Sequence, residues 1–278
     1  MDECAIYYEN IYPTTIAKIG ERSVKVRPFG KDKLRITAVL TVLADGSKLQ
    51  PLLIFKGKTN GPKEKSLQNN INVKKGIIYV KCQEKYVWTD HSLFMFWLNN
   101  IWFANNIKKS VSNSLLIMER ATMNFDPDLS KEFDRHNAKY VLIPPGLTQF
   151  LQPLDIGINK DIKKFMRAAD TNLRIKNKNI HPLSENYIID NFSDVWYNKI
   201  KSESIINSFK KTGISIKMDG LENHLVNIPE IILENFNNPE EYIQDFNQNL
   251  NKDDSINLED NIFSKINDKN MKIDDYFN

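Results

Sequence analysis

The chain has 278 residues, of which 41% are hydrophobic and 26% are charged, and this composition is typical of a globular protein with a sizeable core. No apolar run reaches the ~18 residues that a membrane helix needs, and the opening residues lack the basic and apolar parts of a secretory signal. We therefore expect an intracellular chain with no membrane partner. Its two cysteines form neither a disulfide framework nor a C-x-x-C metal motif. The sequence contains no glycine-rich phosphate loop, so we expect no small-molecule substrate.

The net charge of +3 hides an uneven distribution along the chain. Residues 219–278 contain 14 acidic and 4 basic residues, which leaves 21 acidic and 34 basic residues in 1–218. A basic body favours polyphosphate partners such as nucleic acid, although an ordinary lysine-rich surface has the same composition. We expect one domain over 1–215, followed by an acidic, Asn-rich and largely disordered tail over 216–278.

Hydrophobic periodicity and turn signals predict a mixed α/β order of elements: strands over 22–26, 34–43, 49–55 and 76–82, a helix over 90–105, a strand over 114–118, a helix over 127–136, a strand over 140–143, and helices over 185–201 and 203–211. Asp45 and Gly46 provide turn chemistry for a hairpin between the second and third strands. Residues 58–70 are predicted to form a polar loop, and Thr89 is the expected N-cap of the first long helix.

A basic amphipathic helix is expected after the double proline at 144–145. Four apolar residues recur at helical spacing in it, namely Ile158, Ile162, Phe165 and Met166. Four cations point elsewhere and are the predicted nucleic-acid contacts, namely Lys160, Lys163, Lys164 and Arg167. Asp155 comes at the start of the helix. An acid placed there beside cations can hold a divalent metal next to a phosphodiester, but Asp155 can equally be a helix N-cap.

The sequence PPGLTQFLQPLDIGI at 144–158 resembles the last motif of the DDE-type transposase domain of the pogo, Tigger and jerky group, which is also found in centromere protein B. The matching residues are Pro144, Pro145, Thr148, Leu151, Gln152, Pro153, Leu154, Asp155 and Gly157. Residues 1–3 are similar to the first acidic motif of that family. Residues 30–57, 87–98 and 204–213 resemble its central strands, a helix entrance and its closing helix, so the resemblance covers roughly residues 1–215.

This resemblance implies an RNase H-like fold, with a mixed sheet flanked by helices. It also implies that Asp2, Glu119 and Asp155 are the catalytic acids and the ligands of Mg²⁺ or Mn²⁺. In such sites two ions ~4 Å apart activate a water and stabilise the leaving oxygen during phosphodiester hydrolysis and strand transfer. The implied partner is DNA, and the implied location is the nucleus.

The chain departs from the family at two of the three acids. The middle motif of the family is Asp-Asn-Ala-Pro-Ser-His, whereas residues 119–124 read Glu-Arg-Ala-Thr-Met-Asn. Glu119 is one methylene longer than Asp, and the cation of Arg120 weakens divalent binding by repulsion. At the front, the strand residues that would precede Asp2 are missing, so we expect a truncated first strand. Met1 is then either internal to a longer reading frame or the start of a weakened sheet.

Three functions remain open at this stage. The leading hypothesis is a transposase-derived, nucleic-acid-binding domain whose endonuclease site is impaired. The second is an active Mg²⁺- or Mn²⁺-dependent DNA endonuclease or transposase that uses Glu119 in place of the middle Asp. The third is a protein-interaction module that works without DNA.

Overall fold

The computed structural model describes residues 1–8, 34–84, 89–109, 114–119, 127–144, 146–176, 184–217 and 219–228. The chain divides into two compact units, Met1–Val226 and Asn227–Asn278, and nearly all of the second lies outside the described residues. The predicted strand at 22–26 and most of the predicted tail also lie outside them. The tail boundary therefore stays a prediction, and everything below concerns the first unit.

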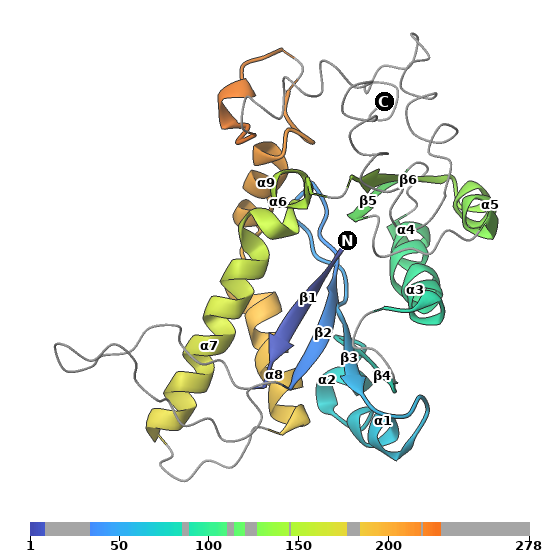
Figure 1. Cartoon of the computed structure of the whole chain (residues 1–278), viewed down its shortest axis with the longest axis vertical. Helices are drawn as coiled ribbons and strands as arrows, with labels where there is room; N and C mark the ends of the chain where they lie inside the picture. The colour runs from blue at the N-terminus through green and yellow to red at the C-terminus, as the bar shows by residue number, and fades with distance from the viewer. Residues whose placement is uncertain are drawn as a thin grey trace, which may run out of the picture. The chain divides into compact units, whose positions relative to one another are not determined.

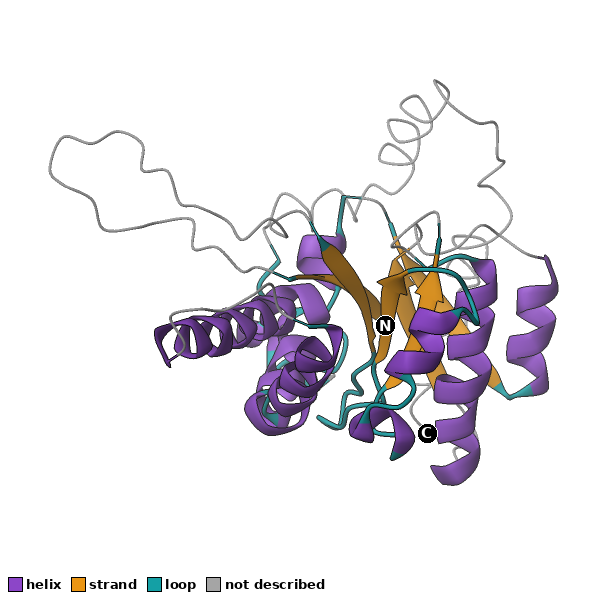
Figure 2. Cartoon of the chain, turned by 90° about the horizontal axis from the view of Figure 1, so that it is seen from below, coloured by secondary structure: helices purple, strands orange, loops and turns teal. Residues whose placement is uncertain are grey.

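A mixed sheet organises this unit (Figures 1 and 2). Its four-stranded part has the order β1 (Asp2–Tyr7), β2 (Arg35–Leu40), β3 (Leu52–Lys56) and β4 (Tyr79–Gln83). The pairs β1–β2 and β2–β3 are antiparallel, and β3–β4 is parallel. A second sheet pairs β5 (Ser114–Glu119) with β6 (Ala138–Ile143) in parallel. Three antiparallel strands followed by parallel ones match the predicted RNase H-like fold.

One backbone contact connects the two sheets. The Met1 nitrogen donates a hydrogen bond to the Ile117 carbonyl over 2.8 Å, which brings the start of β1 beside β5. The Met1 carbonyl instead accepts from the Gln152 side chain, whose Nε2 lies 3.0 Å away. Gln152 is buried, so a side chain from the 144–158 motif satisfies the strand backbone next to Asp2.

The remaining elements are helices: α1 (Pro62–Leu67), α2 (Ile71–Lys74), α3 (His91–Trp97), η1 (Leu98–Phe103), α4 (Ala104–Lys109), α5 (Pro127–Arg135), α6 (Thr148–Leu151), η3 (Leu154–Ile158), α7 (Asn159–Lys176), α8 (Glu185–Asp194), η4 (Val195–Lys199), α9 (Ser202–Lys211) and η5 (Asn223–Leu225). Figure 1 shows α7 and α8 on one side of the strands and α3, α4 and α5 on the other, and Figure 2 agrees. The long helices α3–α4 and α8–η4 are continuous α-helical and π-helical runs.

The core lies between the four-stranded sheet and the helices α7, α8 and α9. Along β1, residues alternate between buried and less buried, so that Asp2, Cys4 and Ile6 point into this core. Ile158 and Ile162 meet them from the other layer and are both buried. The helical spacing of apolar residues predicted for this segment is therefore confirmed, and it determines which face of α7 turns toward β1.

The predicted hairpin of β2 and β3 is confirmed, but three local predictions need correction. The N-cap of α3 is Asp90, whose carboxylate accepts from the Leu93 amide over 2.9 Å, and Thr89 precedes it. The predicted loop at 58–70 contains the helix α1, which begins at Pro62 because proline suits the first helical position. The strand expected over 76–82 begins three residues later, at Tyr79.

Candidate functional site

Asp2 is the first residue of β1 and is 7% exposed. Its Oδ1 accepts from the Glu3 amide over 2.8 Å, and its Oδ2 accepts from Asn159 Nδ2 over 2.6 Å. Burial raises the pKa of Asp2 to about 6, and the negative charge of Asp155 adds to the rise, while the two hydrogen bonds oppose it. Asp2 is therefore a buried acid that carries an electrostatic cost when it is ionised.

Asp155 lies in the π-helical turn η3 and is exposed. The N-cap position of this turn belongs to Pro153 and has no side-chain cap, so the capping alternative for Asp155 is wrong. Its Oδ1 accepts from Asn159 Nδ2 over 2.8 Å. Single π-helical turns within helices are frequent at functional sites, because the extra residue changes the direction of the side chains.

Asn159 connects the two acids, and sequence reasoning did not identify it. It is the first residue of α7 and is 6% exposed. Its amide nitrogen donates to Asp2 and to Asp155, while its buried Oδ1 has no hydrogen-bond partner among the described residues. The signal in the sequence was the spacing, since residues four apart share one face of a helix.

Glu119 ends β5 and is half-buried. Its Oε1 accepts from the Thr148 hydroxyl over 3.0 Å, so the threonine of the 144–158 motif binds the middle acid. Burial raises the pKa of Glu3, and the nearby charge of Glu119 adds to that rise. The carboxylate of Glu3 in turn accepts from the Thr89 amide at 3.3 and 3.4 Å. Glu119 thus accepts a hydrogen bond from Thr148 and lies near Glu3.

The acid pair has the chemistry of a divalent-cation site. Carboxylate and amide oxygens are the ligands that Mg²⁺ and Mn²⁺ prefer, and Asp2, Asp155 and the unpartnered oxygen of Asn159 together provide them. These residues fit one ion. Within the part of the chain that the structure describes, no three His, Cys, Asp or Glu side chains are grouped closely enough to hold a metal. Glu119, which the resemblance gives as the third acid, is bonded to Thr148 and not to the side chain that joins the pair.

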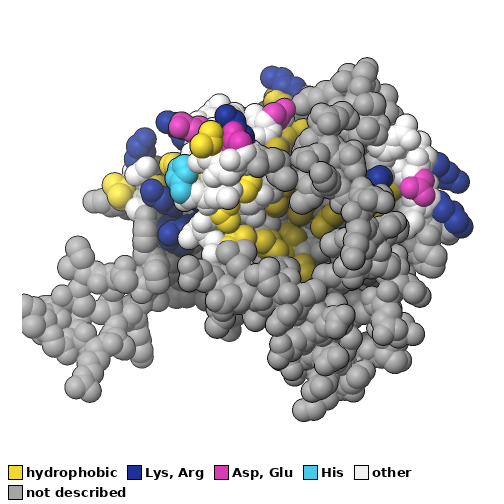
Figure 3. All heavy atoms as spheres, turned by 90° about the horizontal axis from the view of Figure 1, so that it is seen from above, with side chains coloured by type: hydrophobic (Ala, Val, Ile, Leu, Met, Phe, Trp, Pro, Cys, Tyr) yellow, Lys and Arg dark blue, Asp and Glu magenta, His cyan; other side chains and the backbone are white. Residues whose placement is uncertain are grey.

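The four cations predicted to contact nucleic acid all lie on α7, which follows Asp155 in the sequence. Lys160, Lys163 and Lys164 are exposed, whereas Arg167 is half-buried. On the face seen in Figure 3, the described Lys and Arg side chains lie among Asp and Glu, with hydrophobic side chains toward the middle. Basic and acidic side chains are therefore mixed on that face. The phosphate contacts of the α7 lysines stay a prediction.

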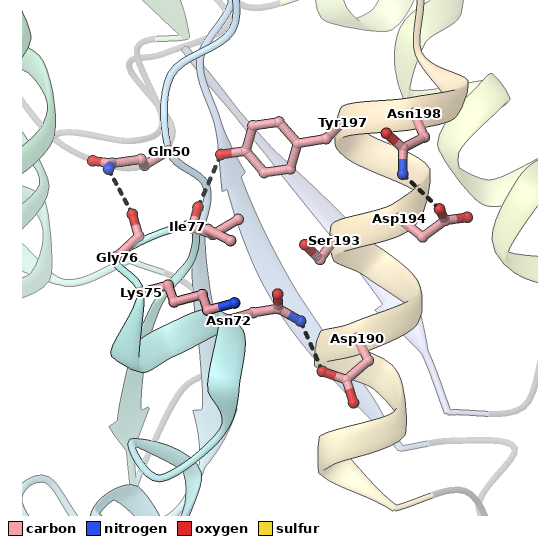
Figure 4. A pocket seen from close by; sticks show the side chains of 10 residues that line it. All are labelled: Gln50, Asn72, Lys75, Gly76, Ile77, Asp190, Ser193, Asp194, Tyr197 and Asn198. Atoms are coloured by element: carbon pink, nitrogen blue, oxygen red, sulfur yellow. Dashed lines mark hydrogen bonds between the residues drawn. The ribbon is translucent and has the colours of Figure 1, made fainter.

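A separate hollow of about 660 Å³ lies between the α2–β4 connection and the helix α8–η4 (Figure 4). Its polar groups are largely bonded to one another. Tyr197 Oη donates to the Ile77 carbonyl over 2.9 Å, and Asn72 Nδ2 donates to Asp190 over 2.8 Å. None of the predicted site residues line this hollow, so it is not part of the acid site.

Among the described residues, no helix is both long and apolar enough to cross a membrane.

Comparison with known proteins agrees with this geometry. Residues 33–209 match the family described as DDE superfamily endonuclease, a span that includes Glu119 and Asp155 and begins after Asp2. Two relatives, both named "Pogo transposable element with KRAB domain", are 30% identical over 225 residues in Mus musculus and over 224 residues in Homo sapiens. Each match covers 78% of this chain and 35% of the relative, so the chain spans about a third of their length.

A third relative, "Pogo transposable element with ZNF domain" from Homo sapiens, is 22% identical over 128 residues, which is 46% of this chain and 8% of the relative. No solved structure matches the chain. The family match covers more than half of the chain and agrees with both the mixed sheet and the 144–158 motif. The chain therefore belongs to the DDE superfamily endonuclease family and is of the pogo type.

Proposed function

We propose that this transposase-derived domain binds nucleic acid and that its endonuclease site is impaired. One observation carries the second part: the carboxylate of Glu119 is bonded to Thr148, while Asp2 and Asp155 meet at Asn159. In two-ion catalysis the middle acid must touch both ions. Glu119 is poorly suited to that role, because its carboxylate is bonded to the Thr148 hydroxyl and because the cation of the next residue, Arg120, repels metal ions.

The proposed partner is DNA, and the proposed location is the nucleus. Lys160, Lys163 and Lys164 provide exposed positive charge on the helix that begins at the acid pair. A phosphodiester drawn to these lysines would lie close to Asp155, which is the exposed member of the pair. The excess of basic over acidic residues in 1–218 supports the same partner.

Salt dependence tests the DNA-binding part. We expect the affinity for duplex DNA, measured by fluorescence anisotropy, to fall steeply with added salt. Replacing Lys160, Lys163 and Lys164 by Ala should reduce the slope of log K against log[salt] by about 2 to 3, since each phosphate contact contributes about 0.9. The matched control changes the same charge at three exposed lysines elsewhere, Lys65, Lys201 and Lys211. Equal losses in both triple variants would overturn the assignment of the α7 lysines as the DNA contacts. Binding that ignores salt would overturn the DNA-binding proposal itself and favour a protein-interaction module.

The alternative is an active endonuclease, and it is favoured by Asp2 and Asp155, whose carboxylates both accept from Asn159. Its test is nicking of supercoiled plasmid in Mn²⁺, compared with Asp155→Asn. Because Asp155 is exposed, this variant should fold as the parent does. Nicking that disappears in the variant would establish the endonuclease and refute impairment. Equal background in both proteins is the result that the proposal expects.

A further inference from the structure

The amide of Asn159 has an unequal hydrogen-bond environment. Its nitrogen donates to two carboxylates, at 2.6 and 2.8 Å, whereas its buried oxygen has no partner among the described residues. A buried acceptor without a donor destabilises the folded state. Turning the amide over would place Oδ1 against two negatively charged oxygens, which is worse still. The two acids therefore dictate the orientation of this side chain as long as no cation lies between them.

The position of the nitrogen is the position that a bridging cation would need. Because Nδ2 contacts Asp2 Oδ2 and Asp155 Oδ1, these two oxygens lie no more than 5.4 Å apart, which is the combined length of the two hydrogen bonds. A Mg²⁺ ion binds each oxygen at about 2.1 Å, so the two oxygens must lie about 3 Å apart as neighbouring octahedral ligands and at most about 4 Å apart as opposite ones. A modest closure brings them to that spacing, and the amide N–H groups must then leave.

We propose that Asn159 is a reversible ligand of this site. In the cation-free chain its N–H groups bridge Asp2 and Asp155 and hold the two acids together. When a divalent cation is bound, the amide is turned over, and Oδ1 faces the cation as a third oxygen ligand. The inference rests on the candidate one-ion site of Asp2 and Asp155 and not on the proposed DNA binding, and it adds to the family's acids a residue that no motif assigns.

Two variants of Asn159 separate this role from a purely structural one. Asn159→Asp presents an oxygen in either rotamer, so we expect it to bind Mn²⁺ about tenfold more tightly than the parent. Asn159→Leu has a similar size and no ligand atom, so we expect binding about tenfold weaker, as is typical when a group that supports a metal site is lost. Mn²⁺ binding is read from the electron paramagnetic resonance signal of the free ion, and cooperative melting is checked for each protein.

Nuclear magnetic resonance tests the same inference in the unaltered chain. The side-chain ¹H–¹⁵N signals of Asn159 are those absent from Asn159→Asp. We expect them to be displaced by the two carboxylates and to move toward the ordinary Asn position when Mg²⁺ is added. Signals that stay in place at saturating Mg²⁺ would overturn the inference.

The outcomes also separate this inference from the proposed function. A parent that binds Mn²⁺ and an Asn159→Leu variant that binds it equally well would overturn the role of Asn159 alone. No Mn²⁺ binding by either the parent or Asn159→Asp would overturn the metal site and the inference together. Neither result changes the salt dependence of DNA binding, which tests the proposed function independently.

Discussion

Replacing Asp2 by Asn should stabilise the metal-free domain at neutral pH. The pKa of Asp2 is raised from 3.8 to about 6, first by burial and then by the charge of Asp155. The folded chain therefore keeps a proton on Asp2 up to about pH 6, whereas the unfolded chain releases it near pH 4. The free energy of unfolding falls between these two pH values, and the loss persists above pH 6.

The shift of roughly 2 pKa units corresponds to about 3 kcal/mol at pH 7, at about 1.4 kcal/mol per unit. Asn has the shape of protonated Asp, and its oxygen can still accept from the Glu3 amide. The new amide nitrogen takes the place of Oδ2 and cannot accept from Asn159 Nδ2, so that hydrogen bond is lost unless Asn159 turns its oxygen toward the new amide. The test therefore rests on how the difference in stability changes with pH. For a unit of this size, 3 kcal/mol raises the melting temperature by roughly 6–12 °C.

The assay is urea unfolding in EDTA at several pH values, for the parent and for Asp2→Asn. The difference between their free energies of unfolding should move in favour of the variant by roughly 2–3 kcal/mol between pH 4 and pH 7. Asp219→Asn, at an exposed acid, is the control and should show no such trend. A constant difference between pH 4 and pH 7 would refute the reasoning, because it would mean that Asp2 titrates normally.

Three further predictions test other parts of the fold and the site. Gly157→Ala should raise the free energy of unfolding in urea by about 0.5–1 kcal/mol, because a Cβ there meets open space and Ala favours helix. A lower free energy of unfolding would show that this turn needs glycine. Lys48→Met should cost about 1.5–3 kcal/mol in the same assay, since Nζ donates to two carbonyls at the end of η4 at 2.6 and 2.7 Å; an unchanged midpoint would contradict this. Glu119→Asp combined with Arg120→Asn should tighten Mn²⁺ binding in calorimetric titration, and no gain would count against the assignment of all three acids.

Local signals in the sequence predicted much of the architecture. Asp45 and Gly46 predicted the hairpin of β2 and β3, and Gly46 has the positive φ of 85° that such a turn requires. The helix α1 was missed because its sequence is polar. Its buried residue Glu64 accepts from the Cys82 amide over 2.9 Å, a contact with β4 that no local pattern reveals. Tertiary contacts of this kind override the preference of a short polar segment for a loop.

The motifs predicted that Asp2, Glu119 and Asp155 form one site, and the structure joins two of them, Asp2 and Asp155, through Asn159. They could not show that Asn159 joins two of these acids, because the bond to Asp2 spans 157 residues of sequence. Nor could they show that Thr148 holds the third. Side-chain hydrogen bonds depend on the packed structure, and the sequence alone determines them poorly.

Two residues of the 144–158 motif are needed by the fold, whereas Asp155 is not. Gln152 satisfies the backbone of Met1, and Leu154 is buried in the core. Either residue would be required even if the domain had no chemistry, so the motif is not in itself evidence of catalysis. Asp155 is exposed, and in the described structure its side chain accepts one hydrogen bond, from Asn159. Its replacement should therefore leave folding nearly unchanged, and any function of this site must appear in how Asp155→Asn alters cation binding, DNA binding or nicking.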